Sequence, residues 1–578
     1  MSKIPPLLAA GRLKLIVLLV VVGILQAAAA IASLLLAKTV FDRILTAQME
    51  TTNEQLVIFG GGLTLMAIII GCLTMAERVV AEKIGQSYAE TVRIRLYDHL
   101  ASLSQRSLQS RSHGGVMLRF VGDLTAVRQW VSLGLARLTV ISLTTVGSLA
   151  ALAFINWMLA ATVGLVLLLG ALISISRGKD MRNATRESRR RMAKLAANIT
   201  EKVGAISVLQ AFGQTSRERK RMLRQSRQLR YAMVAKARVG GKIRGLAEGF
   251  AAFAHGAALV VGAIQVNLAQ TSPGAVIAAL TVISLLVPKL RDLGRVQEYW
   301  HGFNVSKQKM AEFLSIPSLI NELPDAPRIQ RSSGRLEFRQ VCSGILQEFT
   351  ATVEPGTVVA IVGTNGAGKT TLLTLIARLL DPDSGEILID DQNIREYSLS
   401  SVRKLVGVAG PDFPLLRGSL ARNLLYRKPR ASEKERNRVN KLCNIDEVLM
   451  ALPEGEQTRI AEGGVGLSAG QRQRIALARA LLGNPPILLL DEADANLDVQ
   501  ASSVIDQVLA EHTGTILLIS HRRERIIKAD VIWFMENGRL LEVGTPEELL
   551  SGSGPTANFF APRLAMTKNL RPNFAIFK

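Results

Sequence analysis

The chain has 578 residues, more than one ordinary domain holds, so we expect at least two domains. Apolar residues make up 48% of it and the mean hydropathy is +0.24, while 20% of residues are charged. This mixture argues against a wholly water-soluble chain and predicts a membrane part joined to a soluble part. The net charge of +23 fits either nucleic-acid binding or the Lys/Arg excess of cytoplasmic membrane loops, and the positions of the charges decide between them.

Uncharged runs dominate the first half, and a membrane span needs about 20 apolar residues. Two runs have the length of one span each, and two have about twice that length. Polar residues interrupt both long runs, at Asn156 and at 267–273, so each is interpreted as two spans with a short turn. We therefore predict a six-helix transmembrane domain over residues 1–315. The predicted spans are 15–37, 55–76, 138–156, 158–176, 249–267 and 273–288.

The first apolar run follows Lys3, Arg12 and Lys14 and could belong to a secretory signal peptide. It is longer than the 7–15 apolar residues typical of signal peptides. A retained first membrane helix is therefore the expectation.

Basic residues gather between the predicted spans on one side. There are 20 Lys and Arg residues from Arg177 to Arg244 but only one between Phe41 and Glu54. The positive-inside rule then places both chain ends and the loops 77–137 and 177–248 in the cytoplasm, around a cytoplasmic (inner or plasma) membrane. These loops lack strong turn signals over most of their length and are expected to continue the membrane helices. The basic residues are interpreted as a topology signal, so no nucleic-acid partner is expected.

The three cysteines, Cys72, Cys342 and Cys443, follow no metal-ligand spacing and no CxxC spacing. They fit a reducing cytoplasm, and we expect buried, unreactive thiols.

Proline and glycine punctuate residues 316–334, which predicts a linker. A nucleotide-binding domain is predicted over 335–551, without further membrane spans. Residues 552–578 form a basic tail with four phenylalanines. It could pack on the preceding domain or touch the membrane surface, and the sequence does not choose.

The segment 357–362 has the composition of a strand and leads into Gly363-Thr-Asn-Gly-Ala-Gly-Lys-Thr370, followed by an apolar helix. This GxxxxGK[ST] pattern is that of a P-loop, in which backbone N–H groups surround phosphates at a helix N-terminus. Lys369 is expected to reach the β- and γ-phosphates of ATP, and Thr370 to bind Mg²⁺. The predicted nucleotide-binding residues are Gly363, Thr364, Asn365, Gly366, Ala367, Gly368, Lys369, Thr370 and Thr371.

Two further apolar strands end in residues suited to phosphate chemistry. The strand 487–490 leads into Asp491 and Glu492, and the strand 515–519 leads into His521. Because ligands of open α/β sheets bind at the carboxyl ends of strands, these side chains should meet the P-loop. Asp491 is predicted to hold Mg²⁺, Glu492 to activate the attacking water, and His521 to contact the γ-phosphate.

The segment Leu467-Ser468-Ala469-Gly470-Gln471 resembles the LSGGQ signature of ATP-binding cassette (ABC) proteins, with Ala469 in place of a glycine. Asp498, in Ala-Asn-Leu-Asp498, resembles the D-loop aspartate. Six spans before one cassette are similar to an exporter-type half-transporter over essentially the whole chain. Segments 114–128 and 201–214 resemble the two intracellular loops of that group.

The resemblance implies an α-helical membrane domain with long cytoplasmic extensions, followed by an α/β P-loop NTPase domain with a helical subdomain. It also implies a dimer with a second half-transporter, identical or different, in which the signature residues Leu467 to Gln471 contact ATP held by the other subunit. ATP binding and hydrolysis would then drive alternating access.

Two positions depart from the family. Pro411 stands where the family's Q-loop glutamine is expected, and 343–345 lacks the usual adenine-stacking aromatic residue. Phe338 is interpreted as a strand residue instead. Asp412 is a hypothetical replacement ligand near Mg²⁺, against the alternative of a solvated loop acid. These departures leave open a rival function, a poorly hydrolysing regulatory half of a heterodimer.

The predicted spans carry few polar groups, and His255 is their one titratable side chain apart from thiols. It could line a pathway or bond between helices. So sparse a charge suggests a hydrophobic or amphipathic substrate, such as a lipid, a peptide or a drug-like molecule, exported through the lipid bilayer.

Overall fold

The computed structural model describes residues 4–8, 10–45, 53–104, 107–108, 113–329, 332–493 and 499–561. The chain divides into two compact units, Met1–Pro317 and Ser318–Lys578, and each is considered by itself.

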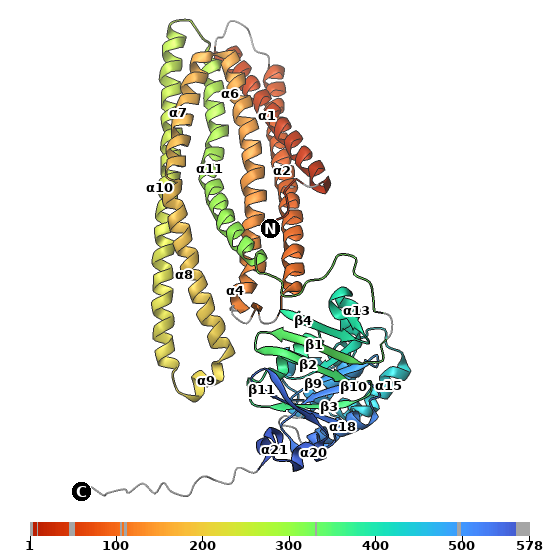
Figure 1. Cartoon of the computed structure of the whole chain (residues 1–578). Coiled ribbons are helices and arrows are strands. Elements are labelled where there is room, and N and C mark those ends of the chain that lie inside the picture. The colour runs from red at the N-terminus through yellow and green to blue at the C-terminus, as the bar shows by residue number, and fades with distance from the viewer. Residues whose placement is uncertain are drawn as a thin grey trace, which may run out of the picture. The chain divides into compact units, whose positions relative to one another are not determined.

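Long helices build the first unit (Figure 1). Five described helical stretches are long and apolar enough to cross a membrane, and the shorter apolar segment Pro273–Lys289 begins a further helix. Each predicted span falls on one of these helices. The helices are α1 (Ala10–Leu45), α2 (Asn53–Ser102), α4 (His113–Leu118), α5 (Leu124–Gln129), α6 (Ala136–Ile155), α7 (Trp157–Ser176), α8 (Gly178–Gly204), α9 (Ile206–Ala211), α10 (Thr215–Asn267) and α11 (Pro273–Leu314), with π-helical turns at η1 (Arg119–Asp123) and η2 (Trp130–Leu135).

The turn between α6 and α7 consists of one residue, Asn156, in extended conformation. Its side-chain oxygen accepts hydrogen bonds from the backbone N–H groups of Met158 and Leu159, both at 3.0 Å, and so caps α7. Its amide donates to Gln265 Oε1 at 2.7 Å, which ties this turn to the end of α10. The polar interruption expected inside the long uncharged run is therefore a helix cap.

The predicted cytoplasmic loops are helical continuations. α2 continues 26 residues beyond the predicted span end at Ala76, to Ser102, and α10 has 53 residues, about 80 Å of helix. In Figure 1, α8 and α10 run side by side and the short α9 joins their far ends. The basic residues of 177–244 lie mostly on solvent-facing sides of these two helices.

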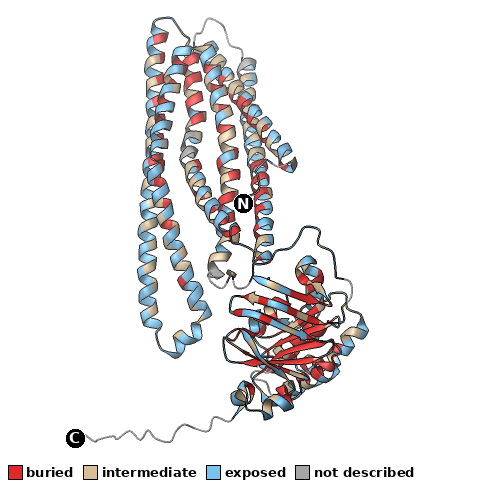
Figure 2. Ribbon diagram, viewed as in Figure 1, coloured by how far each residue is buried: buried red, intermediate tan, exposed pale blue. Residues whose placement is uncertain are grey.

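Many residues of the first unit are exposed (Figure 2). Large apolar residues are among them, as expected for helices that face lipid. Cys72 is among the exposed residues, so the expectation of a buried thiol is wrong there. Lipid supplies the apolar surroundings that a soluble protein would have to build. Cys443 is buried in the second unit, and burial raises the pKa of its thiol well above the usual range.

The second unit is built around a six-stranded sheet of order β12-β11-β3-β10-β9-β6, which is parallel except for the edge strand β12. A second, antiparallel sheet has the order β2-β1-β4-β5. The strands are β1 (Leu336–Ser343), β2 (Leu346–Val353), β3 (Val358–Gly363), β4 (Ser384–Ile389), β5 (Gln392–Asn393), β6 (Val406–Ala409), β9 (Ile487–Asp491), β10 (Thr515–Ile519), β11 (Val531–Glu536) and β12 (Arg539–Gly544).

The central strands β3, β9 and β10 are buried at every position, which agrees with their continuous apolar sequences (Figure 2). Their parallel register brings their carboxyl ends to one edge of the sheet. Phe338 is fully buried on β1, with its ring 5.4 Å from Phe349 and 6.0 Å from Trp533. It is a core residue and not a base-stacking platform.

A group of helices separates β6 from β9 and corresponds to the predicted helical subdomain. They are α14 (Leu420–Leu424), α15 (Glu433–Leu442), α16 (Ile445–Met450) and α17 (Ala469–Leu481). The short strands β7 (Gly418–Ser419) and β8 (Arg459–Ile460) pair within the same region.

Most of the segment after α11 belongs to the second unit, which begins at Ser318. Ile320 and Ile329 are buried, and the fully buried Arg378 donates to the carbonyl oxygen of Asn321 at 3.1 Å. At the other end, α20 (Pro546–Ser551) and α21 (Pro555–Phe560) pack near β12. Of the predicted tail, only residues 552–561 are described.

Candidate nucleotide site and membrane cavity

The P-loop connects β3 to α12 (Lys369–Ile376) in the strand–loop–helix order that the sequence predicts. Gly363, Gly366 and Gly368 all have φ between +82° and +146°, a region that side chains rarely adopt. A Cβ at Gly363 would collide with the carbonyl oxygen of Met535, whereas Gly366 faces open space. Thr364 and Asn365 are exposed at the tip of the loop, and Ala367 is buried beneath it. A loop of this shape leaves backbone N–H groups free to surround phosphate oxygens.

Lys369 is the first residue of α12 and curls back over the loop. Its ammonium group donates to the carbonyl oxygens of Gly363 at 2.8 Å and Thr364 at 3.0 Å, and its side chain is buried. Burial lowers the pKa of Lys369, and the carboxylates of Glu492 and Asp491 oppose that effect. A cation held in this position fits the phosphates of a nucleotide.

Asp491 ends β9 and accepts a hydrogen bond from the side chain of Thr370. Burial raises the pKa of Asp491, and the negative charges of Glu492 and Asp412 raise it further. Asp491 is a desolvated carboxylate beside the Thr370 hydroxyl and two other acids, and a cation would stabilise this group of negative charges. The donor set therefore fits Mg²⁺, which commonly takes one or two carboxylates together with nucleotide phosphates.

Glu492 and His521 face each other across the ends of β9 and β10. His521 Nε2 lies 3.6 Å from Glu492 Oε1, and both side chains are partly exposed. Glu492 has φ of +45°, unusual for a residue with a side chain, while its N–H donates to the carbonyl oxygen of Ile519 at 3.0 Å. Such backbone conformations persist where the surrounding structure enforces them, and they cluster at functional sites.

The signature segment forms the N-terminus of α17. Ser468 is the N-cap residue: its hydroxyl accepts from the N–H of Gln471 at 3.1 Å, and the Gln471 side chain accepts from the N–H of Ser468 at 2.9 Å. Leu467 and Gly470 are buried, while Ser468, Ala469 and most of the preceding glycine-rich turn are exposed. This capping box presents a helix N-terminus to solvent, which suits an anion. Asp498 and the rest of 494–498 lie outside the described residues.

The two departures from the family pattern are visible in the structure. Pro411 follows β6 next to Gly410, whose Cα faces the backbone of Asp491. Asp412 is exposed and acts electrostatically on Asp491. Ile345, 43% exposed, lies beside Gly368 of the P-loop. An aliphatic side chain therefore occupies the region where a stacking aromatic residue was expected.

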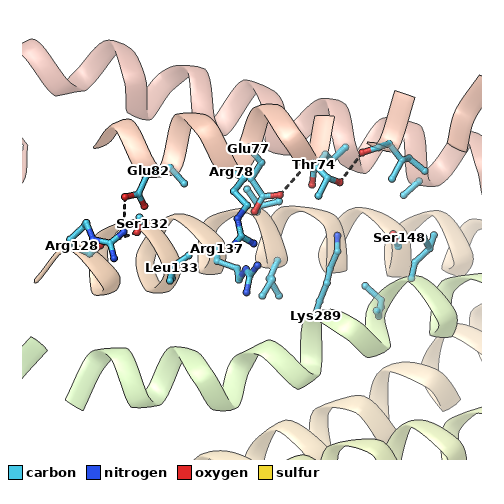
Figure 3. Close-up of a pocket in the computed structure, with 18 residues that line it drawn as sticks. Thr74, Glu77, Arg78, Glu82, Arg128, Ser132, Leu133, Arg137, Ser148 and Lys289 are labelled. Carbon is cyan, nitrogen blue, oxygen red and sulfur yellow. Dashed lines mark hydrogen bonds and ion pairs between the residues drawn. The ribbon is translucent and has the colours of Figure 1, made fainter. Parts of the chain in front are cut away.

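A cavity of about 550 Å³ opens in the first unit between α1, α2, α5, η2, α6 and α11 (Figure 3). Four cations and two carboxylates line it, a net charge of +2. They are Arg78, Arg128, Arg137, Lys289, Glu77 and Glu82. The expectation of a cavity sparse in charge is therefore wrong.

The physical reason lies in how the spans were defined. Each predicted span was an uncharged run, so it ended at the first charged residue although the helix continues. Glu77, Arg78, Arg137 and Lys289 therefore lie within two residues of a predicted span end. The signal was present in the sequence. In a six-span topology, the ends at 76, 138 and 288 all lie on the same side, so their flanking charges are brought to one level.

His255, by contrast, does not line this cavity. Its Nδ1 lies 3.0 Å from the carbonyl oxygen of Ala251, and its Nε2 lies 3.4 Å from Ser284 Oγ on α11. It bonds between helices.

A helical unit able to span a membrane, joined to a P-loop unit whose strands end in phosphate-directed side chains, defines an ATP-driven membrane transporter. Comparison with known proteins is consistent with this class. The model of the ABC transporter transmembrane region matches residues 16–289, and the ABC transporter model matches residues 346–495.

Relatives align over most of the chain. An ATP-dependent lipid A-core flippase of Syntrophus aciditrophicus is 29% identical over 503 residues, which cover 85% of this chain and 83% of that protein. A putative multidrug export ATP-binding/permease protein of Staphylococcus aureus is 28% identical over 555 residues, 94% of this chain and 96% of that protein. The structure of a bacterial Atm1-family ABC exporter with ATP bound superposes with a TM-score of 0.85 at 25% identity, covering 97% of this chain and all of that chain.

The chain belongs to the ABC transporter family and is a half-transporter of the exporter type. The predicted fold class, the family and the ATP-driven activity are confirmed. It is a multi-pass membrane protein.

Proposed function

We propose that this half-transporter uses ATP to export an amphiphile with an anionic head group across the cytoplasmic membrane, as one half of a dimer. The cavity of the first unit is the observation that carries this proposal, because it combines an apolar wall with excess positive charge.

The cavity lining carries four cations and two carboxylates, and Lys289 also donates to the hydroxyl of Thr144. Arg128 donates to Glu82 at 2.6 Å, and Glu77 accepts from Gln26 at 2.9 Å. The cations of Arg78, Arg137 and Lys289 come from α2, α6 and α11, three different helices around the same space (Figure 3). Charges partly removed from water attract an opposite charge more strongly than exposed ones do.

The remaining wall is apolar and includes one polar atom without a partner. Ala30, Ile70, Val140 and Leu285 supply hydrocarbon contacts. Ser148 is buried, and its hydroxyl has no hydrogen-bond partner among the described residues. A phosphate or carboxylate head on an acyl or other apolar body satisfies all three features. The relative named a lipid A-core flippase agrees with a lipid-like substrate, and the putative multidrug exporter agrees with an apolar body.

The proposed roles in the second unit follow from the geometry. Gly363 to Thr371 hold the ATP phosphates, with Lys369 nearest the β- and γ-phosphates. Thr370 and Asp491 hold Mg²⁺, Glu492 orients and deprotonates the attacking water, and His521 contacts the γ-phosphate. Bound MgATP supplies the free energy that the conformational change requires.

The proposed dimer has two supports in this chain. The exposed N-terminus of α17, with Ser468, is directed to solvent and would contact ATP held by the partner. The tip formed by 201–214 exposes Val203, Ile206, Val208 and Phe212, which are 49–73% exposed. Apolar side chains at the end of long helices fit docking on a nucleotide-binding unit. Both termini and this tip are proposed to be cytoplasmic.

A second candidate is a regulatory half with weak hydrolysis. Pro411 and Ile345 favour it, because neither can make the contact that a glutamine or an aromatic ring makes. The opposed pair Glu492 and His521 favours an active site. ATPase activity of the purified chain, measured alone and beside Glu492→Gln, separates the two. A regulatory half would show no difference between these proteins unless a competent partner is added.

The substrate proposal is tested in lipid nanodiscs with two single-chain probes of equal acyl length, lysophosphatidic acid and lysophosphatidylcholine. The wild-type ATPase should be stimulated by the anionic probe at about tenfold lower concentration. Combining Arg78→Gln, Arg137→Gln and Lys289→Gln should remove that preference, while Arg177→Gln, an exposed cation outside the cavity, should keep it. Equal responses of the wild type to both probes would contradict the anionic head group.

A further inference from the structure

The C-terminal helix α21 places an aromatic side chain against the histidine of the nucleotide site. The ring of Phe559 lies 6.4 Å from that of His521, with 37° between the planes. The same ring packs edge-on against Phe534 of β11, 5.8 Å away. Phe534 is 3% exposed and belongs to the main core of this unit. Phe559 thus lies between the rigid sheet and the exposed imidazole.

The helix that carries Phe559 is fixed to the sheet by polar contacts. Both the N–H and the hydroxyl of Thr556 donate to Glu542 Oε2 on β12. Thr556 is fully buried, and Pro555 begins the helix at its first turn. Gly554, just before the helix, leaves no room for a Cβ beside the Glu542 carboxylate. The position of Phe559 is therefore determined by anchoring on β12 and not by the short helix alone.

The imidazole needs an external support. His521 lies just after β10 on a loop segment, and its side chain is 43% exposed. Its Nε2 also lies 3.6 Å from Oε1 of Glu492. An exposed histidine side chain can sample several rotamers unless a neighbouring group packs against it. A ring packed at one face reduces that freedom.

We propose that Phe559 is a positioning residue for ATP hydrolysis, which holds the His521 ring toward Glu492 and the γ-phosphate. The inference rests on the role proposed for His521. It makes the C-terminal segment part of the nucleotide site, and no P-loop, signature or strand-end pattern in the sequence indicates it.

The test is the MgATPase activity of the full chain in nanodiscs. Phe559→Ala should lower kcat about fivefold to tenfold with KM for ATP changed less than about twofold, because nucleotide contacts stay in place while the histidine is misplaced. Phe559→Tyr and Phe559→Trp should restore most of the rate, since they keep a flat ring. Phe559→Leu, which keeps apolar volume but no ring, should resemble the alanine variant.

Controls separate positioning from folding and from the role of His521 itself. Asn558→Ala changes an exposed side chain on the same helix, whose amide donates to the carbonyl oxygen of Ser553, and should keep kcat. His521→Ala should lose activity, and adding Phe559→Ala to it should cause no further loss, because the two act as a unit. Thermal unfolding midpoints should agree among the Phe559 variants.

The outcomes are distinguishable. If His521→Ala hydrolyses ATP at the wild-type rate, the proposed role of His521 fails. If His521→Ala is impaired but Phe559→Ala keeps wild-type kcat, or the two losses simply multiply in the double variant, the positioning role of Phe559 is overturned while the proposed function stands.

Discussion

The two sites of this chain are built in opposite ways. The nucleotide site consists of short contiguous motifs at the ends of neighbouring parallel strands. Many of its groups suited to binding phosphate are backbone N–H groups of the P-loop. The membrane cavity is assembled from single side chains on six elements spread from Gln26 to Lys289. A site made of backbone and local spacing tolerates little sequence change, whereas a site of dispersed side chains can change its ligand by a few substitutions. This contrast explains how one ATP-driven fold can serve many substrates.

The largest effect is expected at the nucleotide site. Glu492→Gln should lower the ATPase rate at least about a hundredfold, since it removes the proposed base but keeps the size of the side chain. ATP binding should be retained because Lys369 and the P-loop are untouched. Steady-state hydrolysis and equilibrium binding of a fluorescent ATP analogue measure the two properties. Loss of both together would argue against this division of roles.

The membrane cavity should respond to the reversal of one charge. Lys289→Glu would change the net charge of the cavity lining from +2 to 0 and should raise the half-stimulating concentration of lysophosphatidic acid about tenfold. The response to lysophosphatidylcholine should change much less. Arg43→Glu, at an exposed residue in the last turn of α1, is the matched charge reversal outside the cavity. An equal response of both variants would show that overall charge, and not the cavity, governs the probe.

A smaller effect is expected where this chain departs from its family. Asp412→Ala should raise the half-saturating Mg²⁺ concentration for hydrolysis about threefold, because a carboxylate near Asp491 would be lost from the metal's surroundings. Asp446→Ala, an exposed acid on α16, is the control. Unchanged Mg²⁺ dependence would leave Asp412 as a solvated loop acid.

The last effect concerns the free energy of unfolding and lies outside both sites. Burial lowers the pKa of His512 to about 4 from its ordinary 6.5. The unfolded chain therefore binds the proton first as the pH falls, so stability is complete above pH 6.5 and decreases toward pH 4, by at most about 3 kcal/mol. His512→Gln should make the unfolding temperature depend less on pH between pH 7 and pH 4.5. Parallel slopes for the two proteins would assign the acid sensitivity to other groups.

The sequence predicted the local site far better than the dispersed one. The sequence predicted that Gly363 to Thr371, Asp491, Glu492 and His521 meet, because spacing along the chain and strand order together determine their positions; their roles stay predictions. The helices were found because uncharged runs report the thickness of a membrane. Arg78, Arg137 and Lys289 were missed because the spans were defined by uncharged runs, which left out the charges at their ends, although the six-span topology places these ends on one side. The contact between Phe559 and His521 was likewise not predicted, since it depends on how the 37 residues between them fold back toward β10.

The central claim is that ATP hydrolysis in the second unit moves an anionic amphiphile through the cavity of the first. Proteoliposomes with fluorescently labelled phosphatidic acid or phosphatidylcholine, read out by chemical quenching of the exposed leaflet, test it directly. We predict ATP-dependent translocation of the phosphatidic acid probe that both Glu492→Gln and the combined Arg78→Gln, Arg137→Gln, Lys289→Gln variant lose. Translocation that does not require ATP, or that is equal for the two probes in the wild-type protein, would contradict the account.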